Sequence, residues 1–195
     1  QNIKPFEIAF KKIKKQIESL RKLGYEIRVL DLGGGIGIRY QANDRLINLK
    51  EYCLLIENLF TNMKLEIIIE PGRSLVGSSG ILLSSVIRKK SGEKKDFIII
   101  DAGMNNLVRP AMYNARHEIF PVKRKNFKNK KYDFVGPICE SADIFIKNNP
   151  SQNLKKDDLV VICSVGAYGA CMSSDYNLRG NIKEIFIKKN KIINE

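Results

Sequence analysis

This sequence contains little histidine, and none of its cysteines lie close together in the sequence. It holds four cysteines, Cys53, Cys139, Cys163 and Cys171, with no CxxC spacing, and a single histidine, His117. A structural zinc site needs closely spaced ligands of these two types. We therefore expect no metal site, and we expect the cysteines to be free thiols.

Long apolar runs are also absent. No run approaches the roughly 18 apolar residues that are needed to cross a bilayer. Residues 1–10 lack the basic and apolar regions of a signal peptide. We therefore expect no membrane association and a cytoplasmic protein.

Positive charge is abundant. The 34 Lys and Arg residues outnumber the 21 Asp and Glu residues, which gives a net charge of +13. The basic residues are dispersed along the chain, and no zinc-finger spacing, basic leucine zipper or aromatic ribonucleoprotein motif accompanies them. We interpret them as a solvated surface, with the basic segment 123–131 as an exposed loop or edge. A nucleic-acid-binding module is the alternative, and it would require salt-dependent binding to DNA.

Residues 1–80 alternate between helix-like and strand-like segments. Apolar residues at helical spacing predict one helix from Phe6 to Leu20 and another from Leu46 to Phe60. Each is followed by a short β-branched run, residues 26–32 and 65–69, that is typical of a buried strand. This order predicts a parallel α/β architecture, in which the loops after the strands build the site.

Beyond about Gly80 the sequence changes character. Short strand-like runs occur at residues 81–86, 96–101, 143–146, 158–164 and 183–188. No comparable set of helical patterns lies between them. Residues 81–195 are therefore predicted to form a β-rich second domain.

Two loops follow the two predicted strands of the first domain. Residues 33–37 read GGGIG, and such glycines let the backbone approach an anion closely, although a structural turn explains them equally well. Residues 70–73 read EPGR, which joins a carboxylate, a rigid turn and an arginine suited to a phosphate or carboxylate. We favour a phosphorylated cofactor here over a surface turn with an incidental ion pair.

Three later segments are rich in reactive side chains. Arg109 and Tyr113 lie four residues apart, Cys139 directly precedes Glu140, and Tyr168 lies between glycines. Each segment alone could be a surface turn that carries polar side chains without a functional role. Their occurrence together on one chain favours a functional site.

The ordered motifs GGG, EPGR, RPxxY, GPxCESxD and GAYG resemble those of the fold-type III pyridoxal-phosphate decarboxylases, most closely the diaminopimelate decarboxylases. The resemblance covers residues 1–177. It implies an α/β plus β fold, with the C-terminal part of an alanine-racemase-like (α/β)8 barrel in residues 1–80. A β-rich sandwich or barrel domain in residues 81–195 would follow. It also implies pyridoxal 5′-phosphate as cofactor, a small amino-acid substrate, and a homodimer with shared active sites.

The resemblance also implies roles for individual residues. It implies cofactor binding by Gly35, Glu70, Pro71, Gly72, Arg73 and Tyr168. It implies substrate binding by Arg73, Arg109, Tyr113, Glu140 and Tyr168. Cys139 would be the catalytic proton donor, reaching with Glu140 into the neighbouring subunit's site. Glu70 would face the pyridine nitrogen and keep it protonated, which strengthens the ring as an electron sink. His117 matches a recurring family histidine, which we interpret as structural.

The sequence also departs from the family pattern. The family's Schiff-base lysine and cofactor-stacking histidine have no counterpart here, and the tail from Asp175 lacks the expected proline- and arginine-rich run. We therefore expect a partial sequence that is inactive by itself.

The implied reaction is the decarboxylation of meso-2,6-diaminopimelate to L-lysine and CO2. Arginine, ornithine and carboxynorspermidine decarboxylases on the same fold are alternatives, as is a non-catalytic homologue that acts as a binding protein. Glu140 follows Cys139 where ornithine-type enzymes usually carry aspartate, which favours diaminopimelate. The two arginines Arg73 and Arg109 also suit a substrate with a distal carboxylate.

Overall fold

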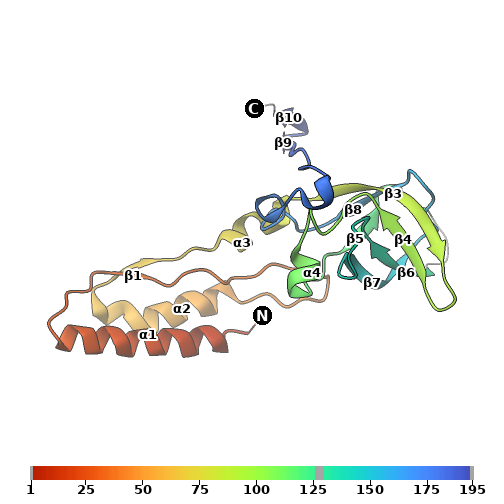
Figure 1. The fold of residues 1–195 in the computed structure, drawn as a ribbon. Coiled ribbons are helices and arrows are strands. Elements are labelled where there is room, and N and C mark those ends of the chain that lie inside the picture. Colours follow the sequence, from red (N-terminus) through yellow and green to blue (C-terminus); the bar gives the residue numbers. More distant parts are fainter. Residues whose placement is uncertain (1, 126–129, 194–195) are drawn as a thin grey trace. The chain divides into compact units, whose positions relative to one another are not determined.

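The chain forms two compact units, residues 1–76 and 77–195. The computed structural model, shown in Figure 1, describes residues 2–125 and 130–193. Part of the basic segment 123–131, namely residues 126–129, lies outside the described residues, and Lys130 and Lys131 begin a strand of the second unit.

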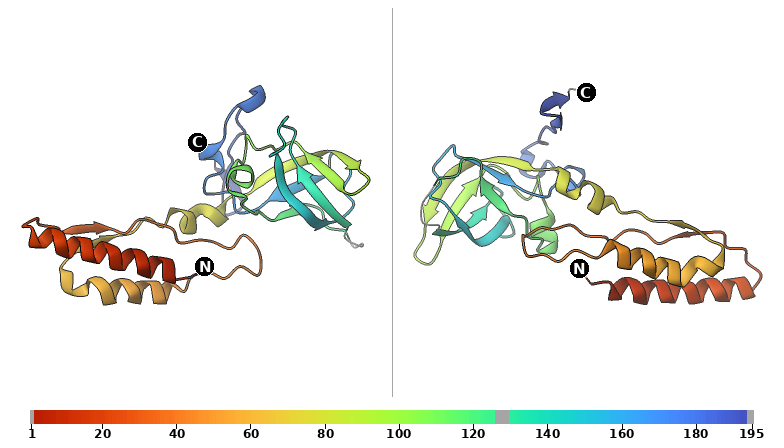
Figure 2. Two further views of the ribbon diagram at one scale, coloured as in Figure 1. Left: turned by 60° about the horizontal axis from the view of Figure 1, so that its bottom comes forward. Right: turned by 180° about the vertical axis from the view of Figure 1, so that it is seen from behind.

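The first unit has two helices that pack against a pair of strands. Its elements are α1 (Lys4–Lys22), β1 (Val29–Asp31), α2 (Leu49–Phe60), a 3-10 turn (Thr61–Met63), β2 (Glu66–Ile68) and α3 (Gly72–Val76). The strands are parallel, with Leu30 opposite Ile67. Figure 2 shows α1 and α2 on one side of this strand pair. Both predicted helices and the parallel arrangement are confirmed, although both strands are shorter than predicted.

Helical spacing explains how α1 and α2 pack. Phe10 and Ile17 face inward from α1, while the lysines of that helix are exposed, except for the half-buried Lys14. Asn48 caps α2 by accepting a hydrogen bond from the Lys50 amide at 3.0 Å. The ring of Phe10 meets that of Tyr52 edge-on, with the centroids 5.8 Å apart. These contacts form one apolar core between the two helices and β1.

The second unit is built on a six-stranded sheet. Its strands are β3 (Leu82–Ser91), β4 (Asp96–Ile100), β5 (Ile119–Pro121), β6 (Lys130–Val135), β7 (Ile144–Ser151) and β8 (Leu159–Ile162), in the order β5-β8-β3-β4-β6-β7. All neighbours are antiparallel except β4 and β6. The buried Asn149 amide on β7 donates to the Ile119 carbonyl oxygen on β5 at 3.3 Å. The two edges therefore nearly close the sheet into a barrel.

The β-rich character predicted for this part of the chain is confirmed. Alternate residues of β4 point inward, and Ile98 and Ile100 are completely buried together with Phe134 of β6. Two strands of the six-stranded sheet, β5 and β6, were not predicted from the sequence. β5 is only three residues long and ends in Pro121, and β6 begins with two exposed lysines, so neither shows a clean apolar alternation.

Short elements complete the second unit. They are the helix α4 (Arg109–Tyr113), the hairpin strands β9 (Phe186–Lys188) and β10 (Lys191–Ile193), and the 3-10 turns Gly77–Ser79, Ala170–Met172 and Tyr176–Leu178. Helix α4 connects β4 to β5 and carries two of the predicted site residues, Arg109 and Tyr113.

Candidate active site

Two loops meet at the carboxyl ends of β1 and β2. The Glu70 amide donates to the Gly33 carbonyl oxygen at 2.8 Å, which ties the GGGIG loop to the EPGR loop. A Cβ atom on Gly34 would lie 2.3 Å from the carbonyl oxygen of Glu70, so only glycine permits this approach. Gly33 and Gly35 have φ angles of +68° and +95°, in the left-handed region that favours glycine. These three glycines are therefore required by the backbone, as the sequence suggested.

The charged side chains of the EPGR loop are accessible. The Gly72 amide donates to the Glu70 carbonyl oxygen at 2.9 Å, and the Ser74 hydroxyl donates to the Pro71 carbonyl oxygen at 2.8 Å. These bonds shape the turn and leave the Glu70 carboxylate exposed and Arg73 half-buried. A glycine-lined backbone beside an accessible carboxylate and guanidinium fits a phosphorylated pyridine cofactor, whose phosphate suits Arg73 and whose ring nitrogen suits Glu70.

In the second unit, Arg109 is buried at the start of α4. Its Nη1 atom lies 3.3 Å from Nε2 of His117, which is itself completely buried. The other ring nitrogen of His117 lies 2.8 Å from the carbonyl oxygen of Cys163. The guanidinium carbon of Arg109 lies 5.6 Å from the centre of the Tyr168 ring, within the range of a cation–π contact. The structure thus brings two predicted substrate-binding residues, Arg109 and Tyr168, together.

The backbone around Tyr168 is strained. Tyr168 has a φ angle of +62°, which is uncommon for a bulky residue. A Cβ atom on the following residue, Gly169, would lie 2.4 Å from the Val165 carbonyl oxygen. Such strain persists only where the surroundings impose it, and it is concentrated at functional sites.

A buried carboxylate shapes the loop that carries Cys139 and Glu140. The Asp143 carboxylate accepts hydrogen bonds from the backbone amides of Met104 (to Oδ1) and Ile138 (to Oδ2), each at 2.7 Å. Burial raises the pKa of the Asp143 carboxyl, and these two amides partly offset that rise. Cys139 and Glu140 are exposed on the loop that Asp143 holds in place.

Glu140 has a partner that the sequence did not indicate. The Tyr176 hydroxyl donates to Oε1 of Glu140 at 2.6 Å, and this hydrogen bond raises the pKa of Tyr176. The two residues are 36 positions apart. Tyr176 lies in the tail that departs from the family pattern, and no local pattern distinguishes it from its neighbours.

Comparison with known proteins identifies the family. The family described as "Pyridoxal-dependent decarboxylase, C-terminal sheet domain" matches residues 25–166. The chain belongs to this decarboxylase family. The match includes both glycine-containing loops, Arg109 and the Cys139–Glu140 pair. Of the predicted motifs, only GAYG at residues 166–169 extends beyond the matched region.

The relatives of this decarboxylase chain agree with one another. Diaminopimelate decarboxylase of Aquifex aeolicus is 40% identical over 98% of this chain and 46% of its own length. The crystal structure of diaminopimelate decarboxylase from Helicobacter pylori complexed with L-lysine is 40% identical with a TM-score of 0.90, covering 98% of this chain and 47% of the other. The crystal structure of diaminopimelate decarboxylase from M. jannaschii in co-complex with L-lysine is 35% identical with a TM-score of 0.91, covering 98% of this chain and 45% of the other. The chain spans about half the length of the curated relatives it matches.

The predicted site residues of the decarboxylase chain divide between its two units. Gly35 and the segment from Glu70 to Arg73 belong to the first unit, and the other predicted residues belong to the second. Tyr113 lies at the end of α4 with an exposed side chain. Within the second unit the structure joins Arg109 to Tyr168 and Glu140 to Tyr176.

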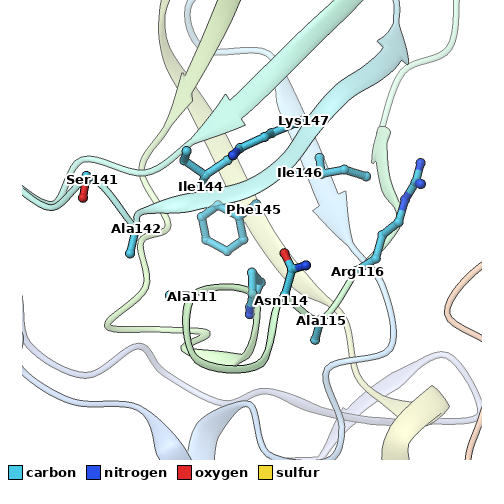
Figure 3. Close-up of a pocket in the computed structure, with 11 residues that line it drawn as sticks. Ala111, Asn114, Ala115, Arg116, Ser141, Ala142, Ile144, Phe145, Ile146 and Lys147 are labelled. Carbon is cyan, nitrogen blue, oxygen red and sulfur yellow. The ribbon is translucent and has the colours of Figure 1, made fainter.

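A surface cavity of about 370 Å³ lies beside these residues but does not include them. It is formed by α4 and the turn after it on one side, and by β7 and the segment before it on the other (Figure 3). Phe145 and the basic side chains of Arg116 and Lys147 are among the residues that line it. None of the predicted site residues lines this cavity, so it is not the predicted site.

Neither a metal cluster nor a membrane span is found in the described part of the chain. No group of three or more His, Cys, Asp and Glu side chains is arranged to hold a metal ion among residues 2–125 and 130–193. Over the same residues, no helix has the length and apolarity needed to cross a membrane.

Proposed function

We propose that the full-length protein decarboxylates meso-2,6-diaminopimelate to L-lysine and CO2. The observation that carries this proposal is the 40% identity with diaminopimelate decarboxylases over nearly the whole chain, which extends through the ordered site motifs. Two of the similar structures contain L-lysine, the product of this reaction.

The cofactor of the proposed reaction is pyridoxal 5′-phosphate, which supplies an electron sink for the carbon that loses CO2. Residues 1–80 would form the C-terminal part of its (α/β)8 barrel, and residues 81–195 the C-terminal domain. Gly35, Pro71, Gly72 and Arg73 would bind the phosphate, because flexible glycine backbone and a guanidinium suit an anion. The Glu70 carboxylate would hold a proton on the ring nitrogen, and Tyr168 would contact the cofactor.

The substrate would be recognised by its distal carboxylate. Arg73 and Arg109 would bind that group, with Tyr113 and Tyr168 beside it, because a guanidinium forms paired hydrogen bonds with a carboxylate. The buried position of Arg109 supports this role, since a guanidinium held in low dielectric attracts an anion more strongly than an exposed one.

The site would be completed by a second copy of the chain. Cys139 and Glu140 are exposed on a loop that the Asp143 carboxylate holds through the Met104 and Ile138 amides, so both side chains are accessible to a partner. In the proposed homodimer they would enter the neighbour's site. There the Cys139 thiol would give its proton to the carbon left by CO2, and Glu140 would meet the far end of the substrate. A cytoplasmic location belongs to the same proposal, because it keeps this thiol reduced.

The test is CO2 release by the full-length, cofactor-loaded protein, offered meso-diaminopimelate, L-ornithine and L-arginine in parallel. We expect turnover of meso-diaminopimelate alone, lost in Cys139→Ala and kept in Cys53→Ala, which removes another exposed thiol. Turnover of ornithine or arginine instead would contradict the assigned substrate and the role of Glu140. No turnover of any of them, with no cofactor bound, would favour the non-catalytic homologue.

A further inference from the structure

The contact between Arg109 and His117 defines the protonation of the histidine ring. A carbonyl oxygen can only accept a hydrogen bond, so the His117 nitrogen at 2.8 Å from the Cys163 carbonyl, Nδ1, must carry the proton. Arginine can only donate, so Nε2 of His117 must accept from Arg109 through its lone pair. The ring is therefore neutral, with its proton on Nδ1.

The neutral ring holds the guanidinium on one side while Tyr168 holds it on another. Tyr168 presents its ring at 5.6 Å, and its own backbone is kept in a strained left-handed conformation. His117 is anchored to the end of β8 through Cys163, and the Cys163 amide in turn donates to the Glu118 carbonyl oxygen at 2.9 Å. Arg109 is thus held in one orientation by a chain of contacts that starts in the sheet.

We propose that His117 is a positioning residue, which aims the Arg109 guanidinium at the substrate carboxylate that the reaction retains. This inference rests on the proposed function. The bond between Arg109 and Nε2 of His117 joins a buried cation to a neutral acceptor, so it restricts the guanidinium without neutralising it.

L-lysine and cadaverine have the same carbon chain between their two amino groups, and together they distinguish a positioning role of His117 from a purely structural one. L-lysine keeps the retained carboxylate, whereas cadaverine is L-lysine without it. If His117 acts through Arg109, its loss weakens binding of L-lysine and leaves binding of cadaverine unchanged. If His117 only stabilises the sheet, its loss weakens both.

Two substitutions separate the two bonds of the ring. His117→Asn places an amide donor near the position of Nδ1 and has no atom that reaches Arg109. His117→Gln has a longer side chain, whose amide offers both a donor and an acceptor. The full-length, cofactor-loaded wild type and both variants would be titrated with L-lysine and with cadaverine by calorimetry, and their melting temperatures compared.

We expect His117→Asn to weaken L-lysine binding roughly tenfold to a hundredfold, the range expected for one hydrogen bond to a charged group. Cadaverine binding should not change, and His117→Gln should restore most of the L-lysine affinity. Wild-type affinity for L-lysine in His117→Asn would overturn the inference. So would an equal loss of both ligands in both variants, with a lowered melting temperature. Absence of meso-diaminopimelate turnover in the wild type would instead refute the proposed function.

Discussion

Removing the Asp143 carboxylate should loosen the loop that carries Cys139 and Glu140. In Asp143→Ala the backbone amides of Met104 and Ile138 lose an acceptor at 2.7 Å each, in a site where the side chain is only 3% exposed. A buried amide without a partner costs about 1–3 kcal/mol, so the two cost about 2–6 kcal/mol. Relief of the buried charge offsets part of this, which leaves an expected loss of about 3 kcal/mol.

Amide hydrogen exchange of residues 136–143 in the full-length protein measures this loss where it occurs. A local opening that is easier by about 3 kcal/mol speeds exchange of the Ile138 amide roughly a hundredfold. Asp143→Asn keeps one acceptor oxygen and should show an intermediate rate. Ser141→Ala changes an exposed side chain of the same loop and serves as the control. CO2 release should fall with the loosening of the loop.

The reasoning would be refuted if Asp143→Ala exchanged at the rate of Ser141→Ala. That result would mean that the two amides find other acceptors, or water, at no cost. An Asp143→Asn variant as fast as Asp143→Ala would show that the carboxylate acts through its charge rather than through its two acceptor atoms.

Two further predictions follow from the same structure. Gly34→Ala places a Cβ atom 2.3 Å from the Glu70 carbonyl oxygen, so the loops must move apart. We expect this to cost about 1–3 kcal/mol and to weaken binding of pyridoxal phosphate, as measured by fluorescence titration. Gly72→Ala, whose Cβ meets nothing within 4 Å, should cost less stability in urea denaturation, and equal losses would contradict the steric argument. A third variant of the chain tests the buried histidine. Burial lowers the pKa of His117 below its usual 6.5, and the charge of Arg109 lowers it further, although the hydrogen bond to Cys163 raises it. As the pH falls, His117 therefore takes up a proton in the unfolded chain before it does so in the folded chain. The free energy of unfolding should therefore decrease below about pH 6.5, less steeply in His117→Gln, and identical slopes would contradict this.

Much of the local structure was determined by the sequence itself. The spacing of Phe10 and Ile17 specified α1, because a helix buries residues three and four apart on one face. The β-branched run 96–101 specified β4, because alternate side chains of a strand point to opposite faces. The glycines of the GGGIG loop also signalled a backbone that other residues adopt only at a cost, and Gly33 and Gly35 do have positive φ angles.

Only the tertiary structure decided which side chains work together. His117 forms a hydrogen bond with Cys163, 46 residues away, and Tyr176 forms one with Glu140, 36 residues away. No local sequence pattern predicts either contact. The short strand β5 forms because β8 supplies its hydrogen-bond partners, not because its own sequence favours a strand. Local propensity is set by neighbours along the chain, whereas the orientation of Arg109 depends on Tyr168 and, through His117, on Cys163, which lie far away in the sequence.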